Sequence, residues 1–287
     1  MSYPYKIDLH MHTRVSDGTD LPSEIINNVK NAGIALFSVT DHDAVKGCAE
    51  ILSLLKKDDP SFITGVEFSC KDELGKYHIL GYRYDVAAPA INSIVAAGHN
   101  LRMEKLEKRL DFLKREFGFD FSNEDVDALR SLDNPGKPHI GNLMVKYGYA
   151  ETKETAINNY INKFHSGNKY VRPEDAIKAI IDSNGIPVLA HPSYGRGDEI
   201  ITGDDMNSRL KRLKEFGLQG VEAFYSGFTP KLQNEILDFA KQYDFFVTAG
   251  SDYHGKNKIV VLGDTNLPDE SMYPPGLIRF IKAVRFK

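Results

Sequence analysis

The sequence predicts an α/β fold in which a largely parallel sheet, open or closed into a barrel, carries an inserted group of helices. From Tyr5 onward, short apolar runs alternate with amphipathic segments, and this alternation favours parallel strands joined by helices. The alternation stops between about Ala96 and Tyr170, where apolar residues recur at helical spacing. Because simple loops are far shorter than this stretch, we expect an inserted helical subdomain.

The expected strands are short apolar runs, many of them separated by helix-like segments. They are Lys6–Leu9, Leu36–Thr40, Phe62–Glu67, His78–Tyr82, Pro187–Ala190, Gly220–Phe224 and Phe245–Ala249. Helices are expected to begin at Pro22, Pro173 and Pro230, since proline in the first helical turn loses no hydrogen bond. Inside the inserted region, one apolar helix face is marked by Met103, Leu106, Leu110, Leu113 and Phe117.

Composition restricts the class of protein. The chain has 287 residues, 41% of them apolar and 26% charged, as in an ordinary globular protein. A net charge of −4 argues against binding nucleic acid through a broad positive surface, but it allows a small anionic substrate. We find neither a signal peptide nor an apolar run long enough to span a membrane. Cys48 and Cys70 are expected to be buried, reduced thiols, and the protein is expected to be cytoplasmic.

Six of the nine histidines lie beside an expected strand end or in a cluster with acidic residues. They are His10, His12, His42, His78, His191 and His254. His10 and His12 are two positions apart, so both imidazoles point to one face if the strand continues through them. The accompanying carboxylates are Asp17, Glu67 and Asp252. Each residue alone fits an ordinary structural role, but the carboxyl ends of parallel strands meet in one crevice, so together they predict a single site.

The residue types in this site predict a catalytic metal centre. The chain has no Cys-x-x-Cys motif, so a closed structural zinc site is not expected. Imidazole and carboxylate ligands suit Mn, Zn or Fe in an open site. Because the ligands are too many for one ion, we expect two or three divalent ions that share Glu67. Paired ions activate a bridging hydroxide for in-line attack at phosphorus, so a phosphoester is the expected substrate.

The motifs in this part of the chain resemble those of a known family. D-L-H-M-H, S-D-G, T-D-H-D, G-V-E-F-S, Y-H-I-L-G-Y, L-A-H-P and S-D-Y-H are similar, in this order, to the motifs of the PHP (polymerase and histidinol phosphatase) superfamily. The resemblance covers most of residues 5–95 and 173–255. It implies a distorted seven-stranded β/α (TIM-like) barrel formed by residues 1–95 and 173–287, with a helical insertion at 96–172 that caps the active site.

The resemblance also implies a distribution of ligands over three metal ions. His10, His12, Glu67 and Asp252 would hold the first ion. Glu67, His78 and His191 would hold the second. Asp17, His42 and His254 would hold the third.

The insertion narrows the expected substrate. K-P-H-I-G-N-L-M-V-K-Y-G-Y resembles the branch that contains nucleoside 3′,5′-bisphosphate phosphatases and a related 5′→3′ exonuclease for short RNA. That branch usually has arginine where this chain has Lys137, and lysine lacks the bidentate fork of arginine. Lys137, His139 and Arg196 are the expected contacts to the substrate phosphate.

We therefore expect a metal-dependent phosphatase whose substrate is a small phosphomonoester, such as a nucleoside 3′,5′-bisphosphate. The catalytic residues are expected to be His191, His254 and Asp252, with one of the two histidines protonating the leaving group. The alternatives are an exonuclease on short RNA, a histidinol-phosphate phosphatase, a non-catalytic metal-binding module and an amidohydrolase. The Pro-His element of the insertion disfavours the histidinol-phosphate phosphatase. The complete ligand set disfavours the non-catalytic module, and the absence of a lysine at a strand end disfavours the amidohydrolase.

Overall fold

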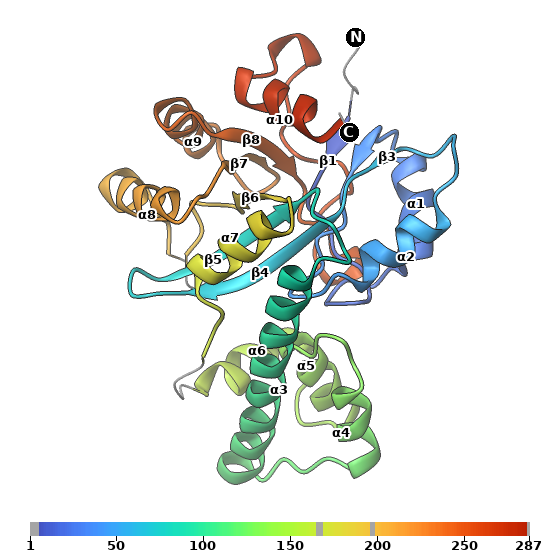
Figure 1. Ribbon diagram of the computed structural model, residues 1–287. Coiled ribbons are helices and arrows are strands. Elements are labelled where there is room, and N and C mark those ends of the chain that lie inside the picture. The colour runs from blue at the N-terminus through green and yellow to red at the C-terminus, as the bar shows by residue number, and fades with distance from the viewer. Residues whose placement is uncertain (1–5, 165–168, 196–198, 286–287) are drawn as a thin grey trace.

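The computed structural model describes residues 6–164, 169–195 and 199–285 as a mixed α/β fold (Figure 1). The strands are β1 (Ile7–Asp8), β2 (Leu36–Phe37), β3 (Ser61–Phe62), β4 (Gly65–Lys71), β5 (Lys76–Tyr82), β6 (Ile186–Leu189), β7 (Gly220–Tyr225) and β8 (Phe246–Gly250). The α-helices are α1 (Pro22–Asn31), α2 (Lys46–Leu54), α3 (Pro89–Phe117), α4 (Asn123–Arg130), α5 (Lys137–Lys146), α6 (Lys153–Asn159), α7 (Pro173–Asp182), α8 (Gly203–Glu215), α9 (Pro230–Gln242) and α10 (Pro275–Arg285). Short 3₁₀ helices are η1 (Ile161–Lys163), η2 (Gly255–Asn257) and η3 (Glu270–Met272).

The described strands form a three-stranded sheet, β1-β2-β3, and a five-stranded sheet, β4-β5-β6-β7-β8. Isolated parallel bridges connect the two sheets, one between Met11 and Tyr253 and another between His42 and Glu67. In addition, the Leu9 N–H donates to the Ala249 carbonyl at 2.9 Å. These connections bring the segments that follow β1, β2 and β8 next to the middle of β4.

The parallel arrangement expected from the sequence holds for most strand pairs but not around β5. β4 and β5 are antiparallel, and so are β5 and β6. Only residues 72–75 connect β4 to β5, and so short a connection makes a hairpin, whereas a parallel crossover needs a dozen residues or more. Glu67 and His78 lie inside β4 and β5, whereas the sequence placed Glu67 at the end of one expected strand and His78 at the start of another.

Helices cover the five-stranded sheet and bury its apolar side chains. α7 packs on β5 and β6, α9 on β7, and α10 on β8. α7 begins with Pro173 and has two acids in its first turn, which suits the free N–H groups of a helix start. Its buried face includes Ile177 and Ile180, so burial of this apolar stripe fixes the helix on the sheet.

The first half of the chain supplies a second, smaller hydrophobic cluster. It includes Ile25 and Val29 of α1, Ile51 of α2, and Phe37 of β2. α1 and α2 contact each other beside the three-stranded sheet (Figure 1). This cluster supports the loops that carry His12 and His42.

The helices α3 to α6 have a hydrophobic cluster of their own. It is formed by Leu106, Leu110, Leu113, Leu129, Ile140, Leu143, Met144, Ala156 and Ile161. The start of α3 belongs to the main core through Ile91, and its later turns extend away from the sheets toward α4, α5 and α6 (Figure 1). α3 therefore connects two separately packed regions.

Among the described residues, no helix is both long and apolar enough to cross a membrane. Cys48 and Cys70 are both buried and unpaired.

Candidate metal centre

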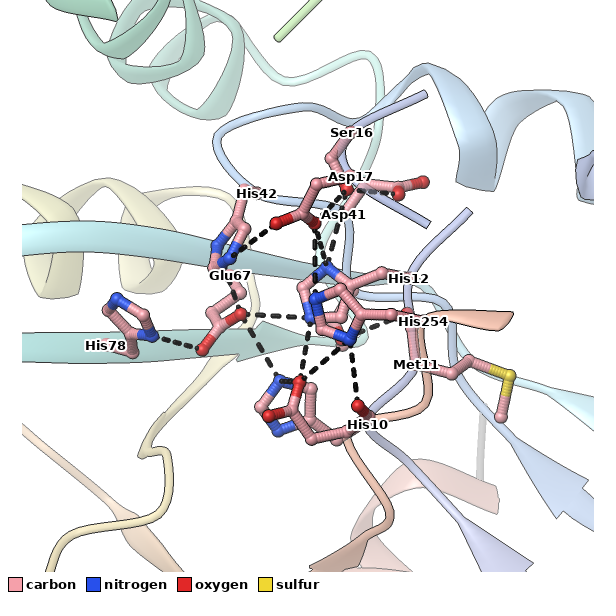
Figure 2. A network of polar contacts seen from close by, with 12 residues as sticks. His10, Met11, His12, Ser16, Asp17, Asp41, His42, Glu67, His78 and His254 are labelled. Atoms are coloured by element: carbon pink, nitrogen blue, oxygen red, sulfur yellow. Dashed lines mark hydrogen bonds and ion pairs between the residues drawn. The ribbon is translucent and has the colours of Figure 1, made fainter. Parts of the chain in front are cut away.

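One buried carboxylate, Glu67 of β4, organises the site. Its Oε2 lies 3.2 Å from His10 Nε2, 3.1 Å from His12 Nε2 and 3.1 Å from His42 Nδ1. Its Oε1 lies 2.7 Å from His78 Nδ1 and 3.2 Å from His191 Nε2. Five imidazoles from segments far apart in the sequence thus surround one side chain. Figure 2 labels four of them, those of His10, His12, His42 and His78, around Glu67.

The strand pairing explains how His78 reaches Glu67. His78 lies opposite Ser69 in the β4–β5 ladder, two residues beyond Glu67. Residues that are directly opposite or two apart share one face of a sheet. His78 is therefore a diagonal neighbour of Glu67 on that face.

A second group of ligands gathers around Asp17. Asp17 Oδ1 lies 3.2 Å from His254 Nε2 and 3.6 Å from His12 Nδ1, and its Oδ2 lies 3.9 Å from His42 Nε2. The rings of His12 and His254 stack with centroids 4.0 Å apart. Figure 2 shows these side chains directed toward one another beside Glu67.

The described residues contain three overlapping groups whose ligand atoms lie within 4.8 Å of one another. These groups are His12, Asp17, His42 and His254; His10, His12 and Glu67; and His42, Glu67 and His78. The remaining expected ligands lie close by, with Asp252 Oδ1 3.6 Å from His10 Nε2 and 3.4 Å from His12 Nε2. His191 Nε2 lies 3.2 Å from His78 Nδ1. The structure thus brings all nine expected metal ligands into one place, which we call the histidine–carboxylate centre.

Carboxylates outside this set hold the imidazoles and loops in position. Glu222 of β7 accepts from His10 Nδ1 at 3.0 Å and from the His191 main-chain N–H at 2.8 Å. Asp41 accepts from the Thr13 N–H and hydroxyl and from the Ser16 hydroxyl, at 2.7–2.8 Å. Such hydrogen bonds fix ring orientation in metal sites. They also fix the loop that carries Asp17.

Two residues of the centre have strained backbones. His191 has φ of 28° and Asp252 has φ of 59°, in the region that residues other than glycine rarely occupy. Strain of this kind persists where surrounding contacts impose it, and it concentrates at functional sites. In His191 the hydrogen bond to Glu222 supplies such a contact.

The unpaired atoms of the centre fit a set of metal ligands. His10 Nε2, His12 Nε2, His42 Nδ1 and Glu67 Oε2 are buried and have no hydrogen-bond partner of acceptable geometry among the described residues. Buried polar atoms without partners are costly in a folded protein. A divalent cation binds to nitrogen and oxygen lone pairs that point to one place and are not used in hydrogen bonds. Imidazole nitrogens and carboxylate oxygens suit Zn, Mn or Fe.

The protonation equilibria of the centre indicate an excess of negative charge. Burial opposes ionisation of Glu67, but His78, His42 and His10 outweigh it and hold the Glu67 pKa well below its usual range. Burial also opposes charge on His12, yet the adjacent carboxylates of Asp252 and Glu67 raise the His12 pKa to about 9. The Glu67 carboxylate is therefore ionised and attracts a proton onto His12, whereas burial outweighs the neighbouring carboxylates at His42 and His254 and lowers the pKa of both. A bound cation would replace the proton on His12.

The expected phosphate contacts are only partly visible. Lys137 is the first residue of α5, and its Nζ donates to Asn162 Oδ1 at 2.5 Å. His139 Nδ1 accepts from the Gly136 N–H at 3.1 Å. Burial lowers the His139 pKa, Asp17 raises it and Arg102 lowers it further, so His139 lies within electrostatic reach of the centre. Arg196 lies outside the described residues.

Three polar residues at the centre were not anticipated from the sequence. Lys258 Nζ lies 2.6 Å from Asp252 Oδ2. Arg102 of α3 binds Asp43, the neighbour of His42, with Nη2 2.6 Å from Oδ2. Asn134 donates to the His42 carbonyl. The S-D-Y-H motif lies four to seven residues before Lys258, which is a weak signal. Arg102 and Asn134 belong to the helical region, where the sequence gives no signal.

Comparisons with known proteins agree with this geometry. A 3′,5′-nucleoside bisphosphate phosphatase from Chromobacterium violaceum is 29% identical over 261 residues, which cover 86% of this chain and 87% of the relative. A phosphoribosyl 1,2-cyclic phosphate 1,2-diphosphodiesterase from Eggerthella lenta is 28% identical, covering 87% of this chain and 94% of the relative. A 5′-3′ exoribonuclease from Haemophilus influenzae is 26% identical, covering 87% and 90%.

Two solved structures share the fold over nearly the whole chain. One, described as a metal-dependent phosphoesterase from Bifidobacterium adolescentis, has a TM-score of 0.82 and 26% identity over 98% of this chain and 96% of that one. The other, an amidohydrolase from Chromobacterium violaceum with bound sulfate and no metal, has a TM-score of 0.79 and 27% identity over 97% and 96%. The model of the PHP domain matches residues 8–176. Since this match spans more than half of the sequence, the chain belongs to the PHP domain family.

Proposed function

We propose that the protein is a metal-dependent phosphoesterase that hydrolyses a phosphomonoester of a small nucleotide, with a nucleoside 3′,5′-bisphosphate as the leading candidate. The observation that carries this proposal is the contact of five imidazoles with the one buried carboxylate of Glu67. A purely structural cluster would satisfy its polar atoms internally, whereas here several are left without partners among the described residues.

The nine ligands can be divided among two or three divalent ions. Glu67 would be shared, with His10, His12 and Asp252 on one side, His78 and His191 on another, and Asp17, His42 and His254 on a third. Mn, Zn or Fe would fit these donors. When bound, such ions supply a water of lowered pKa and neutralise charge on the phosphoryl oxygens.

The protein's own residues would orient the substrate and manage the leaving-group proton. His191 and His254 are the two candidates to protonate the leaving oxygen. The His191 side chain is 15% exposed and that of His254 is 4% exposed, and His254 Nδ1 already donates to the Asp252 carbonyl at 2.8 Å. His191 is therefore the better placed to meet a substrate, and the role of proton donor requires a His191 imidazole that is not bound to an ion. Asp252, held by Lys258 and Tyr225, would act beside it as a ligand at the reacting phosphate.

We also propose that residues 96–172 form a cap over the centre. Asn134 contacts the His42 carbonyl, and Lys153 Nζ donates to Asn257 Oδ1 at 3.0 Å. Asn257 in turn donates to the Asp17 carbonyl at 2.8 Å. These contacts support a cap that rests on the loops of two proposed ligands and presents Lys137 and His139 to the substrate phosphate. In this proposal residues 1–95 and 173–287 form the distorted β/α barrel; its two sheets have eight strands in the described part of the chain, and these correspond to the seven expected ones when β3 and β4 are taken together. Arg196 is kept as a candidate phosphate contact.

Metal-dependent hydrolysis tests the function directly. The purified protein, loaded in turn with Mn, Zn or Fe, should hydrolyse a nucleoside 3′,5′-bisphosphate faster than p-nitrophenyl phosphate, with inorganic phosphate as a product. Metal content is measured on the same samples. Protein that retains metal but releases no phosphate from either compound would contradict the proposal.

The relatives favour one competing substrate, a short RNA with a 5′ end. An exoribonuclease would convert a labelled oligoribonucleotide into a ladder of products, while a phosphatase removes terminal phosphate and leaves the length unchanged. A ladder, together with slow hydrolysis of the bisphosphate, would decide for the exonuclease.

A further inference from the structure

A cluster of cations lies on one face of α3, close to the histidine–carboxylate centre. Arg102, Lys105 and Arg109 are three, four and seven positions apart, a spacing that places side chains on the same side of a helix. Lys105 Nζ lies 3.5 Å from the centre of the Tyr170 ring, and Lys76 Nζ of β5 lies 5.2 Å from it. We call Lys76, Arg102, Lys105 and Arg109 the cation cluster.

The cation cluster has too little negative charge around it. Among residues 6–164, 169–195 and 199–285, Asp43 is the only carboxylate that forms an ion pair with a member, and its partner is Arg102. Arg109 is 9% exposed, and its Nε has no hydrogen-bond partner among those residues. Burial, followed by repulsion from Arg102, lowers the pKa of Lys105 to about 7. A buried cation such as Arg109 is costly without a partner, and four cations face a single paired carboxylate, so the region is suited to receive an anion.

The cluster borders the proposed metal ligands. Arg102 Nη2 donates to Ser69 Oγ at 2.9 Å, and Ser69 N–H donates to Asp43 Oδ1 at 3.1 Å. Ser69 shares a face of β4 with Glu67 and lies two residues, roughly 7 Å, further along the strand. A substrate whose reacting group lies at Glu67 therefore has the cation cluster within reach of its other end.

A small hollow opens between the cation cluster and the sheet. Its lining includes Asp43, Ser69, Arg102, Lys105 and Tyr170. Its open volume is about 10 Å³, enough for one water-sized atom. The hollow thus accepts an oxygen of an anionic group but excludes an aromatic base.

Arg102 is prepared for such a contact. Its Nε donates to Asp43 Oδ2 at 2.7 Å and its Nη2 contacts Asp43 and Ser69, so the guanidinium is held in one orientation. None of the described residues accepts a hydrogen bond from Nη1. A planar guanidinium fixed on one side and unpaired on the other is an efficient phosphate donor.

We propose that the cation cluster binds a second phosphate of the substrate, the one that is not hydrolysed, with one oxygen of this phosphate in the hollow. Nη1 of Arg102 and Nζ of Lys105 would donate to its oxygens, and the charges of Lys76 and Arg109 would stabilise it from further away. This inference rests on the proposed phosphoesterase function and selects bisphosphorylated nucleotides over monophosphates.

The test compares Lys105→Gln with Lys108→Gln, a matched exposed lysine on the same helix. The ratio of kcat/KM for a nucleoside 3′,5′-bisphosphate to that for p-nitrophenyl phosphate should fall about 10- to 100-fold in Lys105→Gln, as expected for loss of a charged hydrogen bond. Lys108→Gln should keep the wild-type ratio. An unchanged ratio in Lys105→Gln, in protein with wild-type thermal stability, overturns the inference and leaves the phosphoesterase function standing.

A binding measurement separates this inference from the function itself. Calorimetric titration of metal-free protein with inorganic phosphate should show binding that Lys105→Gln and Arg109→Met weaken at least tenfold and Lys108→Gln does not. That result would support the anion site even in a protein without hydrolytic activity. A fall in rate confined to a 5′-phosphorylated oligoribonucleotide, with the bisphosphate unaffected, would overturn the assignment to a second terminal phosphate.

Discussion

The histidine–carboxylate centre and the cation cluster are neighbours with opposite electrostatic needs. Around Glu67, ionised carboxylates raise the pKa of His12 to about 9, so this region attracts positive charge. Around Lys105, burial and adjacent cations lower the pKa of the ammonium to about 7, so that region attracts negative charge. The contrast supports the proposed division of the substrate site, in which bound cations would meet the reacting phosphate and protein cations would meet a second one.

The two regions are also built differently. The centre takes its ligands from loops and strands of both sheets, which the bridges Met11–Tyr253 and His42–Glu67 hold together. The cation cluster takes most of its side chains from one helix, α3, and meets the centre through Asp43. The centre therefore depends on the pairing of two sheets, and the cation cluster depends mainly on the packing of one helix.

Removing divalent ions should produce the largest effect and should affect the centre alone. Treatment with a chelator is expected to abolish hydrolysis, and Mn or Zn should restore it. An ion present at 100 times its Kd stabilises a protein by about 2.7 kcal/mol, so the Tm should rise by about 5 to 10 °C on reloading. Thermal denaturation with and without metal measures this shift. Full activity in metal-free protein would show that the centre has another role.

Glu67→Gln should be the most damaging single substitution. The amide keeps the shape but loses the charge that five imidazoles share, and we expect kcat to fall by about 10³-fold, since a loss of about 4 kcal/mol in the transition state corresponds to that factor. Steady-state kinetics with p-nitrophenyl phosphate measures it. Glu104→Gln, on the exposed surface of α3, serves as the control and should keep wild-type rates. Equal rates for both variants would refute the central position of Glu67.

Glu222→Gln should have an intermediate effect because Glu222 acts through His10 and His191. Loss of an orienting partner of this kind typically reduces metal affinity or activity 10- to 100-fold. Metal titration followed by calorimetry distinguishes weakened binding from a slower chemical step. A variant with wild-type metal affinity and wild-type kcat would show that Glu222 is only a packing residue.

The smallest effect concerns stability and is specific to the cation cluster. The Lys105 pKa of about 7 lies below its ordinary value of 10.5, so between these values the unfolded chain holds a proton that the folded chain has released. Wild-type stability should therefore rise with pH across this window. Lys105→Met abolishes that contribution, so its stability gain over wild type should be larger at pH 6 than at pH 9. Urea denaturation in phosphate-free buffer measures the difference; a gain independent of pH would contradict it.

The sequence by itself determined the family, the strand–helix alternation and the identity of the clustered side chains. The sequence is sufficient to recognise the motifs His-x-His, T-D-H-D and S-D-Y-H because strand ends and turns are local features. All three motifs supply residues of the types that bind metal ions. The strands expected from apolar runs are present, with the run Phe62–Glu67 divided between β3 and β4. Local propensity and hydrophobic period were sufficient for these features.

Only the tertiary structure decided which atoms meet. The antiparallel hairpin β4–β5 places His78 diagonally across from Glu67, although neither residue ends a strand. In the sequence, Arg102 and Lys105 have the spacing of charged residues on the exposed face of an ordinary amphipathic helix. Only the packing of α3 against Tyr170 and Asp43 shows that they could bind a ligand. Long-range contacts of this kind depend on how separate elements pack, and no local sequence pattern encodes that packing.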